Sequence, residues 1–295
     1  MSNSAGWQEK FEAIGTHWTI DIFDDPDGIE KDELFDKIHS RINEFDLAYS
    51  RFRSDSLVTQ MSKQAGDYIL PDDATPLIEL YEKLYQLTEG KLTPLIGRTL
   101  EQAGYDASYS LKPKKLIAPP AWDEVLAYEP SNRTLTLKQP ALLDFGAAGK
   151  GYLVDIVSEI IEKEGVQSYT VDAGSDIRYR GQDPLKVGLE NPSEATQAIG
   201  VADLQNQSLC ASAGNRRKWE GFHHIINPHT LQSPQEILAT WAIAETTLIA
   251  DGVTTALFLT APESLTSHFN FQYLILYSDF SIKKSAEFPA ELFLT

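Results

Sequence analysis

Apolar residues recur at helical spacing in some stretches of the chain and alternate with polar residues in others. Helical spacing or a compact apolar face predicts helices over 29–49, 74–90, 94–104, 151–165 and 246–261. Alternation with β-branched and aromatic residues predicts strands over 11–24, 134–138, 168–174 and 271–278. Further short strands are predicted over 186–190, 198–204, 208–213 and 240–245. Helices thus cluster early in the chain and strands cluster late.

This order of elements favours an α+β protein over a regular α/β alternation. We therefore predict mixed or antiparallel sheets packed with helices. Residues 105–133 hold four prolines and little periodicity, which is typical of a linker or a surface excursion. The chain is expected to form a single domain over residues 1–295, or two lobes over about 1–140 and 141–295.

The composition is that of a globular protein with a strongly negative surface. Of the 295 residues, 42% are hydrophobic and 23% are charged, and the net charge is −18. Such a charge repels nucleic acid and anionic lipid at long range, so we expect neither as a partner. A phosphate ligand would need a local pocket, with a metal ion to offset the charge.

The cysteine content and the first residues bear on where the protein resides. Cys210 is the only cysteine in the sequence and cannot form an internal disulfide, which favours a reducing compartment. The opening stretch MSNSAGWQEKFEAIG has no apolar run, and no stretch is long and apolar enough for a membrane span. We therefore expect a cytoplasmic protein.

The stretch LLDFGAAGKGYLVD at 142–155 places an aspartate, three glycines and a lysine between two apolar runs. A Walker-type phosphate loop does not fit, because only two residues separate Gly146 from Gly149 and Gly151 follows Lys150 where Ser or Thr is needed. A glycine-rich turn at a helix N-terminus can still bind an anion, with Lys150 adding positive charge. Alternatively, this is only a strand-to-helix turn that needs positive φ, with Lys150 solvated.

Asp251 and Thr255 are four residues apart in a predicted helix and therefore lie on the same face. A carboxylate and a hydroxyl are hard oxygen ligands that suit Mg²⁺, which also bridges phosphates. Alternatively, the two residues form a polar spot on a core helix, with Thr255 bonded to the carbonyl four residues earlier.

Three histidines fall within GFHHIINPHT at 221–230. His223 and His224 would point to opposite faces of a strand, and the spacing matches none of the common zinc patterns. One histidine that acts as a proton acceptor therefore fits the pattern better than a metal cluster does.

Taken in order, these segments resemble the ApbE family, the FAD:protein FMN transferases, along most of the chain. DFGAAGKGYLVD is similar to the family's D-L-G-G-I-A-K-G-Y-A-x-D, and ADGVTTAL is similar to A-D-A-L-S-T-A-L. DAGSDI resembles N-A-G-G-D-I, and IGT at 14–16 resembles M-G-T. SRFRSDS at 50–56 resembles the flavin-side loop S-x-Y-x-x-x-S, and TEGKLTPLIG loosely matches G-x-F-D-x-T-x-x-P-L. SAGNRRKWEGFHHIINPHT resembles the family segment that ends in H-I-I-D-P-x-T.

The resemblance implies a T-fold-like architecture with FAD bound between two lobes, and an enzyme that uses Mg²⁺. Such enzymes transfer the FMN half of FAD to a Thr or Ser hydroxyl of an acceptor flavoprotein and release AMP. Alternatively, the protein would cleave FAD to FMN and AMP, or bind FAD without catalysis. A nucleotide hydrolase of unrelated fold would rest on the glycine stretch alone.

Carried over position by position, the resemblance implies roles for ten residues. The main-chain carbonyl of Ala147, the carboxylate of Asp251 and the hydroxyl of Thr255 would bind Mg²⁺. His224 would be the base that takes the proton from the attacking hydroxyl. The other six would contact FAD, with Phe52 against the flavin ring, Lys150 near the pyrophosphate, and the rest in the dinucleotide pocket: Gly146, Asp155, Gly174 and Asp176.

The chain also departs from the family pattern. Asn227 stands where the family has Asp before Pro, and Leu231 replaces a Gly, so we expect the turn there to differ. Ser175 replaces the second Gly of Gly-Gly-Asp, and Ala213 replaces the Ser of Thr-Ser-Gly. These changes gather on the adenosine side and the acceptor approach, where they would alter specificity, weaken the activity, or leave a protein that binds FAD without transferring it. The metal-side residues match the pattern.

Overall fold

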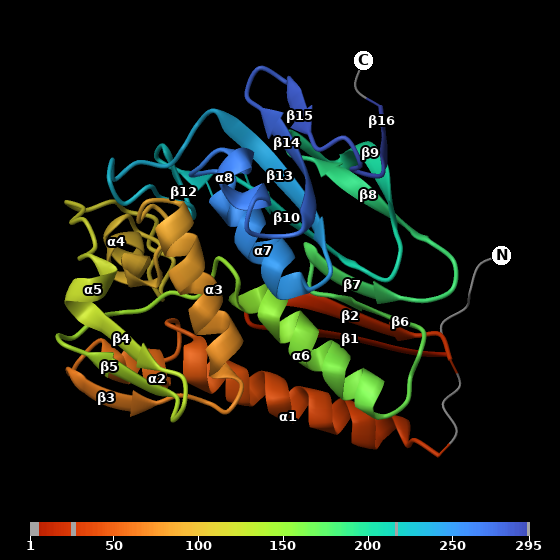
Figure 1. The fold of residues 1–295 in the computed structure, drawn as a ribbon, viewed down its shortest axis with the longest axis horizontal. Helices are drawn as coiled ribbons and strands as arrows, with labels where there is room; N and C mark the ends of the chain where they lie inside the picture. The colour runs from red at the N-terminus through yellow and green to blue at the C-terminus, as the bar shows by residue number, and fades with distance from the viewer. Residues whose placement is uncertain (1–5, 25–27, 216–217, 294–295) are drawn as a thin grey trace.

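An eight-stranded sheet, antiparallel throughout, dominates the computed structural model, which describes residues 6–24, 28–215 and 218–293 (Figure 1). Its strands, in order across the sheet, are β1 (Trp7–Ala13), β2 (Thr16–Ile22), β6 (Tyr169–Asp172), β7 (Asp176–Arg180), β10 (Ser208–Ala213), β13 (Ile237–Ala244), β14 (Phe271–Tyr277) and β15 (Ile282–Lys284). The predicted α+β class with antiparallel sheets is confirmed.

Side chains alternate between the two faces of the large sheet, as the period of a strand requires. On β13, Ala239, Trp241 and Ile243 face a small apolar cluster, whereas Ala242 and Ala244 belong to the main core on the other side. The small cluster is shared with a three-stranded sheet made of β8 (Leu185–Asn191), β9 (Glu194–Leu204) and β16 (Ala290–Leu292).

Four helices build the layer on the main-core face of the sheet. They are α1 (Lys31–Tyr49), α3 (Ala74–Leu87), α6 (Gly149–Lys163) and α7 (Thr247–Ala256). Helices α6 and α7 pack against the strands and against each other, while α1 contacts α6 and α3 contacts α7 (Figure 1). The corresponding predicted helices are confirmed, although α7 ends at Ala256, before the predicted end.

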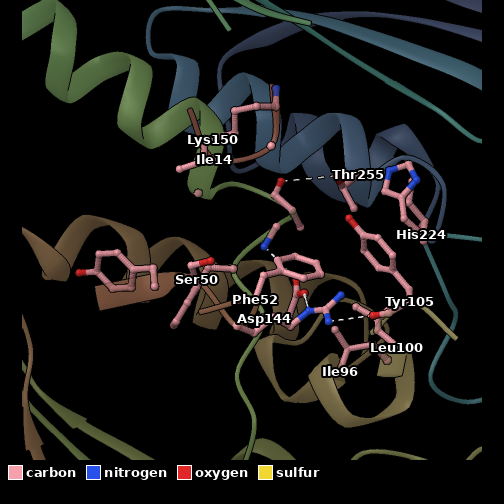
Figure 2. A pocket seen from close by; sticks show the side chains of 18 of the residues that line it. Ile14, Ser50, Phe52, Ile96, Leu100, Tyr105, Asp144, Lys150, His224 and Thr255 are labelled. Atoms are coloured by element: carbon pink, nitrogen blue, oxygen red, sulfur yellow. Dashed lines mark hydrogen bonds and ion pairs between the residues drawn. The ribbon is translucent and has the colours of Figure 1, made fainter. Parts of the chain in front are cut away.

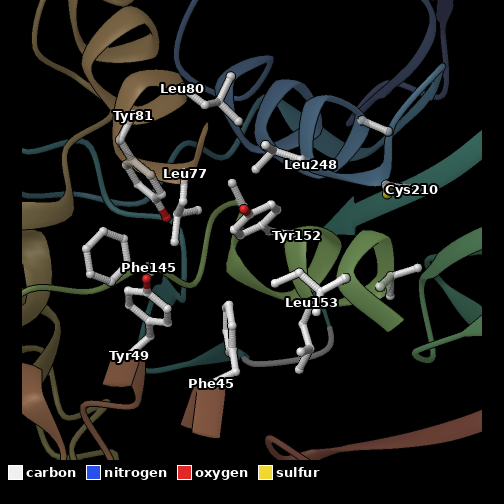
Figure 3. Packing of buried hydrophobic residues seen from close by; sticks show 14 of the residues in the cluster. Phe45, Tyr49, Leu77, Leu80, Tyr81, Phe145, Tyr152, Leu153, Cys210 and Leu248 are labelled. Atoms are coloured by element: carbon white, nitrogen blue, oxygen red, sulfur yellow. The ribbon is translucent and has the colours of Figure 1, made fainter. Parts of the chain in front are cut away.

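Aromatic rings fill the space between α1, α3 and the chain that leads into α6 (Figure 3). The ring of Phe145 lies edge-on to Tyr49 at 5.4 Å and to Tyr81 at 5.3 Å between centroids. Phe45 contacts Tyr49 at 4.7 Å. Edge-to-face pairs of this kind stabilise a core by about 0.5–1.5 kcal/mol each beyond the area they bury. They fix the segment just before α6, where the glycine stretch begins.

The remaining elements surround these layers. The predicted helix at 94–104 is α4 (Gly97–Gln102), preceded by the 3₁₀ turn η1 (Pro94–Ile96). The predicted excursion at 105–133 is irregular only as far as residue 121. It continues into α5 (Trp122–Val125) and β4 (Leu126–Glu129), and β4 joins a small sheet with β5 (Thr134–Leu137) and β3 (Gly66–Ile69). Short elements complete the described chain: α2 (Leu57–Met61), β11 (Lys218–Trp219), β12 (Phe222–His223) and α8 (Pro262–Thr266).

The prediction of one strand over 11–24 is wrong, because the chain reverses within it. Ala13 lies opposite Thr16 in the β1–β2 pair, which leaves Ile14 and Gly15 as a two-residue turn. Their φ angles are 45° and 75°, the left-handed values that tight hairpins of this twist require at both positions. A β-branched residue rarely adopts such a φ, so the periodic pattern gave no sign of a turn at Ile14.

The two halves of the chain share one sheet. Strand β2 pairs with β6, so the hairpin from the first residues continues a sheet whose other strands follow residue 168. A division at residue 140 therefore does not follow the sheets. None of the helices in the described residues combines the length and the apolar character that crossing a bilayer requires.

Gly151 lets α6 and α7 approach each other closely. A Cβ atom at this position would lie 2.4 Å from the carbonyl oxygen of Thr247 and 2.6 Å from the Cβ of Asp251. The alternative that the glycines of this stretch serve a turn of positive φ is wrong, since Gly146, Gly149 and Gly151 are absent from the positive-φ residues. Close approach, not backbone conformation, requires glycine at position 151.

A carboxylate from α6 caps the N-terminus of α7. Asp155 Oδ1 accepts a hydrogen bond from the Thr247 amide at 2.8 Å, and Oδ2 accepts one from the Leu248 amide at 2.7 Å. These amides have no acceptor within their own helix, and an acidic group at this end also complements the helix dipole. Helix α6 therefore fixes where α7 begins, and with it the positions of Asp251 and Thr255.

We predict that Gly151→Ala destabilises the protein by about 1–3 kcal/mol, because the atoms that meet the new Cβ belong to two packed helices. The free energy of unfolding should be measured in urea by circular dichroism. Gly188→Ala on β8 is the matched control, since a Cβ there meets only the Ala198 Cβ at 3.9 Å. Equal stability of the two variants would contradict the close-approach account.

Asp155 gives a prediction about pH. Burial raises the pKa of its carboxyl to about 6, and the two amide hydrogen bonds offset this only in part. A pKa raised on folding favours the protonated group, so this contribution to stability is complete below about pH 4 and is lost as the pH rises through 6.

Relative to Asp155→Asn, the wild-type free energy of unfolding should therefore fall by about 2–2.5 kcal/mol between pH 4 and pH 7. Urea titrations of both proteins across this range test the difference. Two curves that stay parallel would contradict it.

Candidate active site

A cavity of about 410 Å³ opens where segments from both halves of the chain meet (Figure 2). Its walls come from the β1–β2 turn, the loop after α1, helix α3, the glycine stretch, residues 224–226 and the end of α7. Six of the ten predicted site residues line it: Phe52, Gly146, Ala147, Lys150, His224 and Thr255.

The other four predicted residues lie outside the cavity lining. Asp155 caps α7, and that contact accounts for its burial. Gly174 sits in the turn between β6 and β7 with a φ of 82°. Asp176 and Asp251 are buried behind Lys150, whose side chain reaches the cavity.

Lys150 connects the cavity to a buried acidic pair. Its ammonium forms an ion pair with Asp176, which is fully buried, and donates to Ser175 Oγ at 3.1 Å. Burial alone would lower the pKa of Lys150, but the charges of Asp176 and Asp251 outweigh burial and hold the pKa above its ordinary value. Lys150 therefore stays cationic at the cavity wall.

The side chain of Asp251, which belongs to α7, lies at the N-terminal end of α6. Its Oδ2 accepts a hydrogen bond from the Gly151 amide at 2.9 Å, so a protein carboxylate uses part of the anion-binding capacity of that helix end. Burial and the nearby charge of Asp176 raise the pKa of Asp251 well above its ordinary value, against the opposing effect of Lys150. Two carboxylates and one ammonium leave this buried cluster short of positive charge.

Thr255 lies against the glycine stretch. Its Oγ1 donates to the carbonyl oxygen of Ala147 at 3.4 Å (Figure 2). The alternative in which Thr255 bonds to the carbonyl of Asp251 is not observed; the neighbouring Thr254 donates to that carbonyl at 2.8 Å. Within the part of the chain that the structure describes, no three His, Cys, Asp or Glu side chains are grouped as a metal site. A cation at this place would depend on the Ala147 carbonyl, the Thr255 hydroxyl and water besides one carboxylate.

The adjacent histidines do point in different directions. His223 is buried, its Nδ1 accepts from the Ile225 amide at 3.2 Å, and its Nε2 donates to the Pro234 carbonyl at 2.8 Å. Burial lowers its pKa, which agrees with a neutral structural ring. His224 instead lines the cavity on the side of Thr255 (Figure 2).

Arg51, Asp144 and Tyr105 belong to the cavity wall, although the sequence did not single them out. Arg51 Nε contacts Asp144 Oδ2 at 2.5 Å, and Phe52 lies 5.4 Å from Tyr105 between ring centroids. Arg51 lies in the motif SRFRSDS and Asp144 in DFGAAGKGYLVD, so their place in these motifs was the sequence signal that could have identified them. Tyr105 follows α4 in the irregular segment and carried no pattern.

Two departures from the family pattern keep a structural role. The Ser175 hydroxyl accepts from Lys150, so the change from glycine adds a contact to the site. Leu231 has a φ of 57°, and its amide donates to the Asn227 carbonyl at 2.8 Å. Leu231 thus adopts the left-handed φ that favours glycine, although it carries a side chain.

Comparisons with known proteins identify the family of this chain. The ApbE family model matches residues 14–273. An FAD:protein FMN transferase from Haemophilus influenzae is 26% identical over 273 residues, which cover 84% of this chain and 79% of that protein. One from Escherichia coli (strain K12) is 22% identical over 275 residues, covering 85% and 78%.

Solved structures show the same fold. An ApbE protein from Thermotoga maritima matches with a TM-score of 0.80 at 22% identity, over 95% of this chain and 97% of that chain. The flavin transferase ApbE from Vibrio cholerae matches with a TM-score of 0.78 at 18% identity, over 96% and 97%. The family match spans most of the chain and includes every residue discussed at the cavity, so this protein belongs to the ApbE family.

Proposed function

We propose that this protein transfers the FMN half of FAD to a Thr or Ser hydroxyl of an acceptor flavoprotein and releases AMP. The observation that carries the proposal is the cavity. The glycine stretch with Lys150, a wall of aromatic side chains and His224 line it together, in a chain of the ApbE family. Relatives named FAD:protein FMN transferase support the same activity. The single cysteine, which is buried, supports a reducing setting such as the cytoplasm.

The charge of the cavity wall suits a pyrophosphate. The net charge of −18 would repel FAD from the protein surface as a whole. Cations nevertheless outnumber carboxylates in the wall, which contains Arg51, Arg53, Lys91 and Lys150 against Asp46 and Asp144. The positive charge is local to the cavity, where a diphosphate would bind.

His224 is the proposed base. A hydroxyl is a weak nucleophile at its ordinary pKa, and an imidazole near neutral pH can take its proton. In the proposed step the hydroxyl oxygen bonds to the phosphorus of the FMN half and its proton passes to His224. The pyrophosphate bond to AMP breaks, and AMP leaves with the electron pair.

The residues beside the cavity fit a Mg²⁺ ion. The Ala147 carbonyl, the Thr255 hydroxyl and the Asp251 carboxylate are the hard oxygen donors that Mg²⁺ prefers, with water completing its shell. The two buried carboxylates exceed the single ammonium of Lys150, so a cation would balance the cluster. The chemistry that Mg²⁺ supplies when bound is neutralisation of the charge on the pyrophosphate and on the departing AMP.

The proposed function is tested with FAD, Mg²⁺ and a flavoprotein that normally carries phosphoester-linked FMN, prepared without it as the acceptor. Mass spectrometry of the acceptor and chromatography of the nucleotides report the outcome. Covalent FMN together with AMP supports the transfer. Free FMN with AMP would show hydrolysis instead, and intact bound FAD would show binding alone.

Replacing His224 by Ala should lower the transfer rate by about 10²–10⁴-fold, the usual contribution of a general base, while FAD binding stays within about threefold of wild type. Single-turnover transfer and FAD titration by fluorescence provide the two measurements. His229→Ala is the matched control, because His229 belongs to the same segment, is exposed and lies outside the cavity lining. Normal turnover of the His224 variant would remove it as the base.

Asp251→Asn should abolish the response of the transfer rate to Mg²⁺, because the amide loses the charge that a cation requires. An amide oxygen can still accept from the Gly151 amide, so the contact between α6 and α7 is retained. Transfer rates across a Mg²⁺ titration, with melting curves to verify the fold, measure this effect. An undiminished Mg²⁺ response would exclude Asp251 as a ligand.

A further inference from the structure

Arg51 is a buried arginine in the loop that follows α1. Its side chain is only 2% exposed. Nε donates to Asp144 Oδ2 at 2.5 Å, and Nη1 donates to the main-chain carbonyl of Tyr105 at 2.8 Å. These two contacts hold the plane of the guanidinium against the cavity wall.

The third nitrogen of this group has no acceptor. Nη2 of Arg51 is buried and makes no hydrogen bond with any described residue, although the side chain lines the cavity. Buried polar groups are almost always paired, and a charged donor without an acceptor is unfavourable. A ligand in the cavity that carries an oxygen acceptor would remove this deficit.

The surroundings of Arg51 select the kind of ligand. Its guanidinium carbon lies 4.2 Å from the centre of the Phe52 ring and 4.7 Å from that of Tyr105. Figure 2 shows Tyr105 with Ile96 and Leu100 on one side of the cavity, while Lys150 lies on the other. The donor therefore belongs to the aromatic and apolar part of the wall, which suits a flat heterocycle better than a phosphate.

We propose that Arg51 determines flavin specificity by donating a hydrogen bond from Nη2 to a carbonyl oxygen of the isoalloxazine ring. The inference rests on the proposed function, because FAD is the ligand that brings this ring into the cavity. The ring presents carbonyl acceptors along one edge and flat apolar surface elsewhere, which matches a fixed donor among aromatic side chains.

The same arginine connects the flavin to the glycine stretch. Asp144 accepts from Arg51 through Oδ2 and from the Gly146 amide through Oδ1, the latter at 2.8 Å. The Arg51 side chain would therefore contact the flavin ring and, through Asp144, also support the segment that contains Ala147. A ring without the carbonyl edge would leave Nη2 unpaired, and this is the physical basis of the selectivity.

The test compares ligands that carry the flavin ring with one that lacks it. Arg51→Lys keeps a cation for Asp144 but removes the planar group that supplies Nη2. Calorimetry with riboflavin, FAD and ADP gives the three dissociation constants. We expect riboflavin and FAD to bind about 10- to 100-fold more weakly and ADP to change less than about threefold, since a charge-assisted hydrogen bond is lost on the flavin side only.

Arg41→Lys on α1 is the control for exchanging an arginine that is paired with an aspartate. Arg41 pairs with Asp73 and lies outside the cavity lining, so riboflavin affinity should remain within about threefold of wild type. Melting curves establish that both variants are folded. If Arg51→Lys does not fold, Arg51→Gln serves in its place, with the same expected loss on the flavin ligands.

Several outcomes would overturn the inference. Unchanged riboflavin affinity in the Arg51 variant would show that Nη2 makes no contact with the ring. An equal loss for ADP and riboflavin would place the effect in the general shape of the cavity. A loss for ADP and FAD with unchanged riboflavin affinity would place the contact at the phosphates. A wild-type protein that binds neither riboflavin nor FAD would overturn this inference and the proposed function together. Failure of transfer with the expected binding pattern would overturn the proposed function alone.

Discussion

The contact between α6 and α7 is the constraint on which the site depends. Gly151 brings the two helices together, and its amide donates to the Asp251 carboxylate at the start of α6. Asp155, one turn further along, caps the start of α7. Because both contacts come from the same helix, the angular and axial positions of α7 are set together. Thr255 thereby reaches the carbonyl of Ala147.

The cavity beside this junction carries positive charge, although the protein as a whole is negative. A chain with a net charge of −18 has a cavity in which cationic side chains outnumber acidic ones. Lys150 can remain charged there because Asp176 and Asp251 lie behind it. Arg51 in turn forms an ion pair with Asp144. At these two places in the wall, a carboxylate that is largely buried holds the cation in position.

Sequence patterns predicted the long amphipathic elements well. Helices α1, α3 and α6 follow their apolar spacing, since burial of one face decides where such helices form. Prediction failed where a turn contradicted residue preference. Ile14 adopts a left-handed φ that a β-branched residue seldom takes, and Leu231 does so where glycine is usual. In both cases hydrogen bonding and packing of the neighbouring segments outweigh the local preference.

The sequence by itself determined the candidate residues for chemistry: the glycine stretch, the pair Asp251 and Thr255, and one histidine of a cluster. Only the tertiary structure decided which of them reach a common cavity. It placed the Asp155 side chain at the start of α7 and kept His223 in the core. It also brought Arg51 to the cavity wall with one nitrogen that has no acceptor among the described residues. The reason is that a motif fixes neighbours along the chain, whereas burial, ion pairing and access to a cavity depend on segments far apart in sequence.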